Sequence, residues 1–340
     1  MELNPNLLSS RVDHARKRLA HDRQVISYAH HWQFPAITEK TAYESILPHA
    51  NQITFEYLGI PWATIIDGLR SKALATWELL RVLNQVPAQP NKTGMRRATV
   101  AQHINADKYI ELYLSCHVTD LFWSHATFET REICGIRIHP FPLFPAQTPN
   151  GPDPADNIHR PRSYLANFIG AYNPKVYLTD VRENIFKDAG SADDLLIIKR
   201  DAWHFNRTVY AEQMKGLSPD AAKLALEDQH KKEYLQAIRD SAFTLCPTGS
   251  GPNSIRIGEA LALASIPVIL TRDLALPGPA SLWQEACVFE EDSSAGYQRA
   301  LSYIRNMPVA KLRAMQVATQ KLYARVGPRA WDQLIINTME

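Results

Sequence analysis

Short apolar runs alternate with amphipathic stretches from about residue 24 to the end of the chain, and this alternation constrains the fold more than any other feature. The pattern is typical of strand and helix units built around mostly parallel sheets. In the first half of the chain it predicts strands at residues 24–29, 51–58, 98–104 and 119–125, and helices at 38–47, 66–83 and 107–115. The first half is therefore expected to form an α/β domain.

A proline-dense polar passage divides the chain between residues 140 and 162, in the sequence PFPLFPAQTPNGPDPADNIHRPR. Such a passage cannot hold a central strand or helix. After it, strands are predicted at 163–172, 194–200, 242–247, 264–271 and 287–291, and helices at 221–241, 254–263, 294–306 and 309–325, with a final helix beyond. A chain of 340 residues exceeds what one hydrophobic core usually organises. The predicted division is a first domain at 1–145, a linker at 146–162, a second domain at 163–310 and C-terminal helices at 311–340.

Charge and hydropathy exclude several classes of partner. The net charge of +2 is too small for the basic stripe of a nucleic-acid-binding protein. The sequence contains no apolar run long enough to span a bilayer, and its first residues lack the apolar core of a signal peptide. These features predict a cytoplasmic protein with at most peripheral membrane contact, for which the basic residues 16–18 are the candidate.

The segment from Ser241 to Asp273 carries the strongest functional signal. It predicts a strand, a glycine-containing loop, a helix that opens at Ser254 and a further strand. A loop that joins the carboxyl end of a parallel strand to a helix N-terminus is a common ligand site, and the free amides and the dipole of the helix favour phosphate there. Gly249 and Gly251 would let a ligand approach the backbone, and Asn253 or Ser254 would cap the helix.

Two charged residues follow in the predicted helix, Arg256 in the first turn and Glu259 one turn later. A cation near a helix N-terminus has the wrong sign for the helix dipole, but it suits a bound diphosphate. A carboxylate in the position of Glu259 could accept hydrogen bonds from ribose hydroxyls. The alternative is structural: Ser254 and Glu259 cap the helix reciprocally and Arg256 pairs with a surface carboxylate. Helix physics alone leaves both interpretations open.

The same segment resembles the hallmark of exostosin-like glycosyltransferases, family 47. The resemblance rests on Ser241, Phe243, Leu245, Cys246, Pro247, Gly249, Ser254, Arg256, Glu259, Ala260, Ile266, Pro267, Val268 and Ile269. Upstream, TDLFWSHAT, GIRIHPFPLFP and RSYLANFIGA are similar to segments that end the family's first domain and open its second. The resemblance covers about residues 95–310. It implies a GT-B fold, in which two Rossmann-like domains with mostly parallel sheets face a cleft. It further implies that the second domain holds the donor and that the transfer inverts the configuration at the anomeric carbon. It also implies that Ser254, Arg256 and Glu259 belong to the donor site.

No D-x-D motif, the metal-binding signature of many GT-A glycosyltransferases, occurs in the sequence. No metal or other cofactor is therefore expected, and cationic side chains and helix amides would stabilise the leaving diphosphate. Arg256 is the leading candidate, with Lys199 and Arg200 as further candidates at the end of a predicted strand. In the loop that follows, Trp203 and His204 could stack on a nucleobase, or they could anchor the loop to the core.

An inverting transfer needs a base for the proton of the acceptor hydroxyl. Histidine suits this task, and three histidines stand at the ends of predicted strands of the first domain. They are His31, which is next to His30, and the more distant His103 and His125. Glu39 is an alternative base. The sequence does not choose among these residues.

The sequence thus predicts an inverting, metal-independent glycosyltransferase that moves a sugar from a nucleotide sugar, expected to be a UDP-sugar, to a glycan or polysaccharide acceptor. Within the enzymes, the alternative is a fucosyltransferase-like GT-B protein that uses another nucleotide. The second class of function is a non-catalytic pseudo-glycosyltransferase that acts as a scaffold in polysaccharide assembly. A product assay distinguishes the enzyme from the scaffold.

Overall fold

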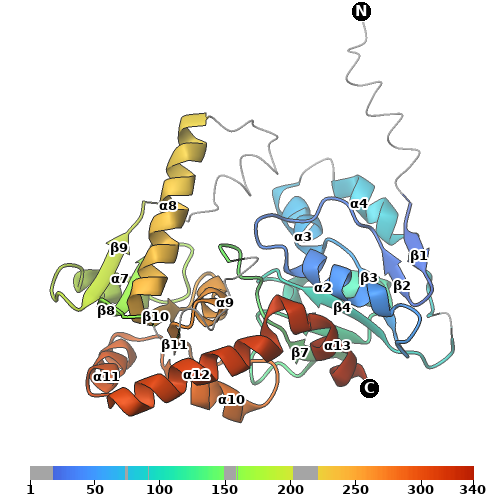
Figure 1. The fold of residues 1–340 in the computed structure, drawn as a ribbon. Helices are drawn as coiled ribbons and strands as arrows, with labels where there is room; N and C mark the ends of the chain where they lie inside the picture. The colour runs from blue at the N-terminus through green and yellow to red at the C-terminus, as the bar shows by residue number, and fades with distance from the viewer. Residues whose placement is uncertain (1–17, 73–75, 91, 149–157, 159, 202–220) are drawn as a thin grey trace, which may run out of the picture.

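The computed structural model describes residues 18–72, 76–90, 92–148, 158, 160–201 and 221–340, and they form two α/β domains (Figure 1). The first domain has a seven-stranded sheet in the order β1-β2-β3-β4-β5-β7-β6. Its strands are β1 (Ala20–Asp22), β2 (Val25–Ser27), β3 (Glu56–Gly59), β4 (Arg97–Ala101), β5 (Asp120–Trp123), β6 (Glu132–Ile133) and β7 (Ile136–Pro140). Strands β2, β3, β4, β5 and β7 are parallel, and the edge strands β1 and β6 pair antiparallel.

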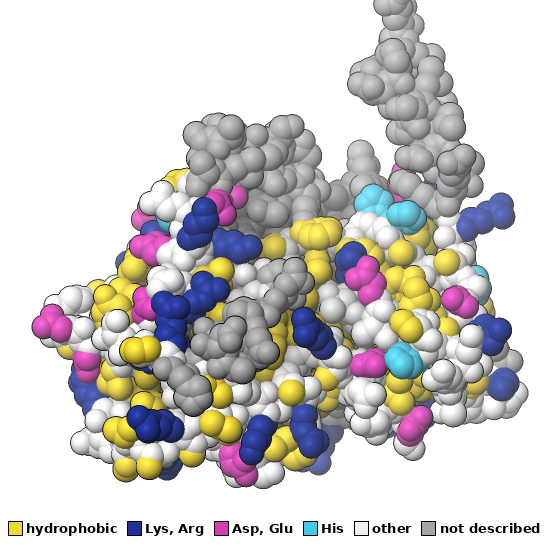
Figure 2. Space-filling view, in the orientation of Figure 1, with side chains coloured by type: hydrophobic (Ala, Val, Ile, Leu, Met, Phe, Trp, Pro, Cys, Tyr) yellow, Lys and Arg dark blue, Asp and Glu magenta, His cyan; other side chains and the backbone are white. Residues whose placement is uncertain are grey.

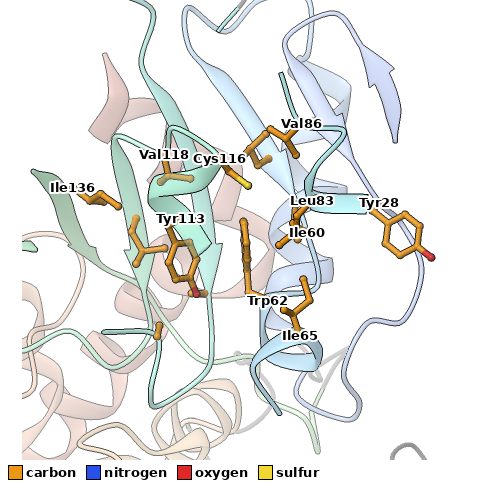
Figure 3. Close-up of a cluster of buried hydrophobic side chains, with 14 of the residues drawn as sticks. Tyr28, Ile60, Trp62, Ile65, Leu83, Val86, Tyr113, Cys116, Val118 and Ile136 are labelled. Atoms are coloured by element: carbon orange, nitrogen blue, oxygen red, sulfur yellow. The ribbon is translucent and has the colours of Figure 1, made fainter. Parts of the chain in front are cut away.

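Helices cover both faces of this first sheet. They are α2 (Thr38–Ile46), α3 (Trp62–Ser71), α4 (Thr76–Leu83) and α5 (Ile110–Ser115), with short 3-10 turns at Leu47–His49 and Asp107–Tyr109. On the face of α3, α4 and α5, the buried indole of Trp62 lies 4.6 Å from the ring of Tyr113, centre to centre, within the apolar cluster of Figure 3. Its Nε1 donates to the Thr99 hydroxyl at 2.7 Å, so the only polar atom of the indole is satisfied.

The second domain has a five-stranded sheet in the order β12-β11-β10-β8-β9, in which neighbouring strands pair in parallel. The strands are β8 (Tyr164–Gly170), β9 (Leu195–Lys199), β10 (Ser241–Pro247), β11 (Ile266–Leu270) and β12 (Val288–Glu290). The helices are α7 (Val181–Lys187), α8 (Ala221–Asp240), α9 (Ile255–Ala262), α10 (Ala280–Ala286), α11 (Ser294–Arg305) and α12 (Val309–Val326). All seven residues of β10 are buried, as expected for a central strand covered on both faces.

The last helix, α13 (Trp331–Met339), returns to the first domain after a short 3-10 turn at Pro328–Ala330 (Figure 1). Its Trp331 is fully buried against Phe141 and Phe144, with ring centres 4.9 and 6.2 Å away. Because α12 packs on α9 and α10 of the second domain, the C-terminal helices contact both domains.

These domains confirm the predicted fold class of two mostly parallel α/β units. The predicted single helix at 66–83 is wrong, because the chain forms α3 and α4 there instead. Lys72 ends α3 in the left-handed conformation, with φ 54°, and its amide donates to carbonyls of the last turn. A lysine rarely takes this role, which usually falls to glycine, and the pattern of apolar residues does not reveal it. Strands β1, β6 and β7 and helices α7 and α10 were also not predicted.

Candidate functional site

The carboxyl edge of the second sheet contains the point at which the chain changes direction across the sheet. Strand β8 connects onward to β9 on one side, whereas β10 connects to β11 on the other, so β8 and β10 are neighbours at the switch point. In open parallel sheets, ligands bind outside this point. Helix α9 begins here, after the loop that contains Gly249 and Gly251.

The N-terminus of α9 differs from the sequence prediction in its capping. Ser254 occupies the N-cap position, but its side chain makes no capping hydrogen bond. Asn253 does not cap either, since its Oδ1 accepts from the Ser254 amide at 2.7 Å and its Nδ2 donates to the Ser124 carbonyl of the first domain at 2.6 Å. The prediction that one of these side chains caps α9 is therefore wrong. The Ile257 amide donates to the Ser254 carbonyl at 3.1 Å, so the first-turn amides that a side-chain cap does not satisfy are those of Ile255 and Arg256.

Arg256 extends from α9 across the end of β8. Its Nη2 donates to the Ile169 carbonyl at 2.7 Å, and its Cζ lies 4.9 Å from the centre of the Phe168 ring. A Cβ on Gly170 would lie 2.6 Å from the same Nη2, so a side chain at that position would displace the guanidinium. The buried Nε has no hydrogen-bond partner among the described residues. Arg256 does not pair with a surface carboxylate in the described part of the chain, as the structural alternative required.

Arg182 of α7 lies on the same ring, with its Cζ 5.6 Å from the centre of Phe168. It is 4% exposed, and its guanidinium donates to the carbonyls of Thr248 at 2.8 Å, Ala171 at 3.2 Å and Pro247 at 3.4 Å. Burial, together with the charge of Arg256, lowers the pKa of Arg182 to about 9, so the guanidinium remains charged at neutral pH. No local sequence motif marks Arg182, and it is not among the residues predicted for the site.

Glu259 lies on α9 with 2% of its surface exposed and both carboxyl oxygens engaged. Oε1 accepts from the backbone amide of Gln147 at 2.9 Å, and Oε2 accepts from the Tyr234 hydroxyl of α8 at 2.6 Å. Burial raises the pKa of Glu259, while the Tyr234 and Gln147 hydrogen bonds and the charge of Arg256 oppose this rise. A carboxylate has about four lone-pair sites, so two remain for further donors. Its role against ribose stays a prediction, and Tyr234 is a second contact that the sequence did not indicate.

The other predicted donor-site cations point elsewhere. Lys199 is exposed, and its Nζ lies 5.7 Å from the ring centre of Phe186 on α7. The Arg200 guanidinium forms an ion pair with Glu233 of α8, and its backbone amide donates to the Gly170 carbonyl at 2.7 Å. Trp203 and His204 lie outside the described residues.

The first domain meets the α9 loop through His125. A Cβ on Gly251 would lie 2.6 Å from the His125 Nδ1, and this nitrogen accepts from the Asn253 amide at 3.4 Å. Burial, followed by the charge of His103 nearby, lowers the pKa of His125 to about 3, against a hydrogen bond with the Gln102 backbone. His125 is therefore neutral at ordinary pH, and its ring forms part of the contact between the domains.

His103 is also buried, and both of its ring nitrogens are engaged. The Asn105 amide donates to Nδ1 at 3.0 Å, so Nε2 carries the proton and donates to the Asp67 Oδ1 at 3.2 Å. The second carboxylate oxygen of Asp67 accepts from Gln33 at 2.7 Å. Both ring nitrogens of His103 are therefore occupied by protein groups.

His31 differs from the other two histidines because its ring is exposed at the carboxyl end of β2. The residue takes the left-handed conformation, with φ 60°, and its ring stacks on Tyr28 with centres 6.1 Å apart. The Thr64 hydroxyl donates to its carbonyl at 2.6 Å, which fixes the turn against α3. These contacts place the imidazole at the surface of the same sheet edge that carries His103 and His125.

Glu39 is 3% exposed in the first turn of α2, and its carboxyl group faces the start of α3. Its carboxyl group accepts from the Ala63 amide at 3.1 and 3.2 Å and from the Gln102 amide at 3.1 Å. Burial raises the pKa of Glu39 to about 8, while these amides oppose the rise. The carboxyl group thus satisfies backbone donors at the edge of the first sheet, which is a structural role for the alternative base.

The described residues contain no cluster of His, Cys, Asp and Glu side chains that could hold a metal ion. Of the helices in the described ranges, none combines the length and apolarity of a bilayer-spanning segment. A cavity of about 640 Å³ lies along β12, α10 and α12 and includes none of the predicted site residues. Figure 2 shows cationic side chains over much of the second domain in this orientation, whereas histidines appear over the first.

Comparisons with known proteins support the family resemblance. A rice protein named "Probable glucuronosyltransferase GUT1" (Oryza sativa subsp. japonica) is 33% identical over 92 residues, which are 26% of this chain and 22% of that protein. "Ribitol-5-phosphate xylosyltransferase 1" of Danio rerio is 28% identical over 124 residues, 36% of this chain and 23% of that protein. The matched parts thus span less than a quarter of these relatives.

Among solved structures, a variant of Staphylococcus aureus TarM in complex with fondaparinux, alpha-GlcNAc-glycerol and UDP gives a TM-score of 0.43 at 9% identity, covering 88% of this chain and 59% of that one. A trehalose 6-phosphate synthase of Burkholderia multivorans gives 0.45 at 10% identity, covering 89% and 74%. The family model of the exostosin GT47 domain matches residues 94–295, more than half of the chain. The match includes β4 to β12, Arg182, Arg256 and Glu259, and the chain therefore belongs to the exostosin GT47 family.

Proposed function

We propose that this protein transfers a sugar from a nucleotide sugar, with UDP as the nucleotide, to a glycan acceptor, with inversion and without a metal ion. The observation that carries the proposal is the N-terminus of α9 at the switch point of the second sheet, whose first turn has no side-chain cap and contains Arg256. Free amides and a cation at one point are what a diphosphate requires in place of a metal.

The donor would lie along α9. Its diphosphate would accept from the first-turn amides and from Arg256, and its ribose hydroxyls would donate to Glu259 one turn later. This order agrees with the positions of the two side chains, because Arg256 reaches toward β8 whereas Glu259 faces α8 and the segment at Gln147. Membership of the exostosin GT47 family supports a nucleotide-sugar donor.

In the transfer, the acceptor hydroxyl oxygen bonds to the anomeric carbon while the bond from that carbon to the diphosphate breaks. The electron pair leaves with the diphosphate, and the hydroxyl proton passes to a base on the first domain. Of the three candidate histidines we propose His31, because it is exposed at the carboxyl edge of the first sheet, whereas His103 and His125 are buried.

Titration calorimetry with UDP in the presence of EDTA tests donor binding. We expect binding that is unchanged by the chelator. Binding that is lost with EDTA and restored by magnesium or manganese would contradict the metal-free site, and preference for GDP would favour the fucosyltransferase-like alternative. If UDP binds but no nucleotide sugar in a panel gives product with any glycan acceptor, the scaffold alternative gains support.

Replacing Arg256 by alanine tests the leaving-group role. Loss of a charge-assisted contact to the departing diphosphate costs about 3 kcal/mol, so turnover should fall about a hundredfold in a folded variant. Circular dichroism checks the fold. Unchanged turnover in a folded Arg256→Ala variant would remove this residue from the mechanism.

A further inference from the structure

We propose that Arg182 is a second cation of the diphosphate site, and that it acts as a positioning residue from behind the loop that leads into α9. This inference rests on the proposed function, because it assigns a further residue to the same donor site. The two guanidiniums come from α7 and α9, and both lie against the ring of Phe168.

The first argument is the lack of charge compensation. The hydrogen-bond acceptors that the described residues offer to Arg182 and Arg256 are all backbone carbonyls. Carbonyls satisfy N–H groups but do not neutralise the charge, and burying an unpaired charge is costly. The Glu259 carboxylate interacts with Arg256 and offsets part of its charge, whereas Arg182 forms no ion pair among the described residues. The like charge of Arg256 near Arg182 therefore raises the free energy of the folded protein until an anion is bound.

Other buried arginines of the same chain are compensated. Arg97 is fully buried in the first domain, and its Nε donates to the Glu56 carboxylate at 2.6 Å. Arg162 also donates to carbonyls, but these belong to residues 238–239 at the end of α8 and 263–264 just after α9. Helix C-termini carry partial negative charge, which offsets a cation. Arg182 and Arg256 lie instead near the N-terminus of α9, where the helix dipole adds to their positive potential.

The second argument is the position of Arg182 relative to the loop. Its three carbonyl acceptors belong to Ala171, which follows β8, and to Pro247 and Thr248, at the end of β10. Its Nη2 lies 3.7 Å from the place that a Cβ on Gly249 would occupy. Because these carbonyls point toward Arg182, the guanidinium fixes the backbone of the loop at both strand ends.

A doubly charged ligand fits this arrangement better than a carboxylate. Two guanidiniums and the first turn of α9 supply positive potential from three directions, and a diphosphate spreads its charge over several oxygens. Arg182 would act on the ligand through its charge and through the loop it holds. Loss of Arg182 should therefore weaken phosphate-dependent binding and spare contacts to the nucleoside.

The test compares UDP with uridine on Arg182→Gln and Arg182→Lys by titration calorimetry. Because a charge-assisted interaction corresponds to about a 10- to 100-fold change in affinity, we expect Arg182→Gln to weaken UDP binding by this factor and Arg182→Lys by less. Uridine affinity should change by less than about twofold. Inorganic pyrophosphate should raise the Tm of the unmodified protein and raise that of Arg182→Gln much less.

Arg162→Gln is the matched control, since it removes another arginine of the second domain that donates to carbonyls, and it should leave UDP affinity unchanged even if it lowers the Tm. UDP affinity of folded Arg182→Gln equal to that of the unmodified protein would overturn the proposal, as would equal losses for UDP and uridine. If Arg182→Gln fails to fold, unchanged UDP affinity in Arg182→Lys would overturn it, and a loss specific to UDP would support it. Failure of the unmodified protein to bind UDP would instead contradict the proposed function.

Discussion

The carboxyl group of Glu259 is satisfied by one side chain and one backbone amide that come from different parts of the chain, Tyr234 and Gln147. This arrangement fixes the orientation of a buried acid next to Arg256, where burial disfavours its ionised form. Every hydrogen bond that favours the carboxylate therefore affects both the charge of Glu259 and its readiness to accept from a ligand.

Tyr234→Phe should lower stability in a pH-dependent way. The Tyr234 hydroxyl donates to the carboxylate and lowers the pKa of Glu259, so its removal costs about 1 to 2 kcal/mol where Glu259 is ionised. The folded-state pKa of Glu259 is raised. The difference in unfolding free energy between the variant and the unmodified protein should therefore be largest above that pKa and shrink as pH falls through it. Urea unfolding at several pH values measures this, with Tyr303→Phe on the exposed surface of α11 as control. A difference independent of pH would contradict the link to Glu259.

His31→Ala should depress transfer by about 10² to 10⁴ and spare UDP affinity, because the donor is held by the other domain. Initial rates and calorimetry separate the two effects. The pKa of His125, about 3, lies below the range of ordinary assays, so an acidic limb in the pH profile cannot come from that residue. Full activity of His31→Ala would exclude it as the base. If His103→Ala and His125→Ala also keep full activity and the acidic limb, histidine catalysis is excluded and a carboxylate such as Glu39 becomes the better candidate.

At the scale of elements, the unit from β10 through its loop to α9 and β11 could be predicted because its signals are local. A buried apolar strand, a glycine loop and a helix start follow one another within 33 residues, from 241 to 273. The end of α3 could not be predicted, since it depends on a left-handed Lys72. Arg182 and Tyr234 could not be predicted as site residues for another reason. Their contacts join elements far apart in the sequence, and neither residue belongs to a local pattern.

Two glycines of the α9 loop should respond differently to an added methyl group. A Cβ on Gly251 would lie 2.6 Å from the His125 Nδ1 and 2.8 Å from the Ile104 Cγ2, both in the first domain, whereas a Cβ on Gly249 meets nothing closer than 3.7 Å. Gly251→Ala should therefore cost about 1 to 3 kcal/mol of unfolding free energy, and Gly249→Ala less than about 0.5. Thermal unfolding without ligand compares them. Equal stabilities would show that the loop does not pack tightly on His125.

At the scale of the whole molecule, the domains meet both at the sheet edges and through α13. At the sheet edges, the Phe128 amide donates to the Asp273 carbonyl and the Ala275 amide donates to the Ala126 carbonyl, both at 2.9 Å. Away from them, α13 packs on the first domain directly after α12 of the second (Figure 1). The alternating pattern predicted two domains and a final helix, but no sequence period reports which domain a terminal helix covers.

Trp331 should be the residue through which α13 stabilises this arrangement. Its ring is fully buried against Phe141 and Phe144, and its Nε1 donates to the Val326 carbonyl at 2.9 Å. Trp331→Ala should lower the free energy of unfolding by about 3 to 5 kcal/mol, because it leaves a large cavity and an unpaired carbonyl. Trp77→Ala is the control, since that indole is 66% exposed on α4 and its loss should cost less than about 0.5 kcal/mol. Denaturant unfolding followed by circular dichroism gives both values. Because the donor site lies in the other domain, the folded fraction of Trp331→Ala should still bind UDP. A loss of less than about 1 kcal/mol in unfolding free energy would mean that α13 contributes little to the stability of the first domain.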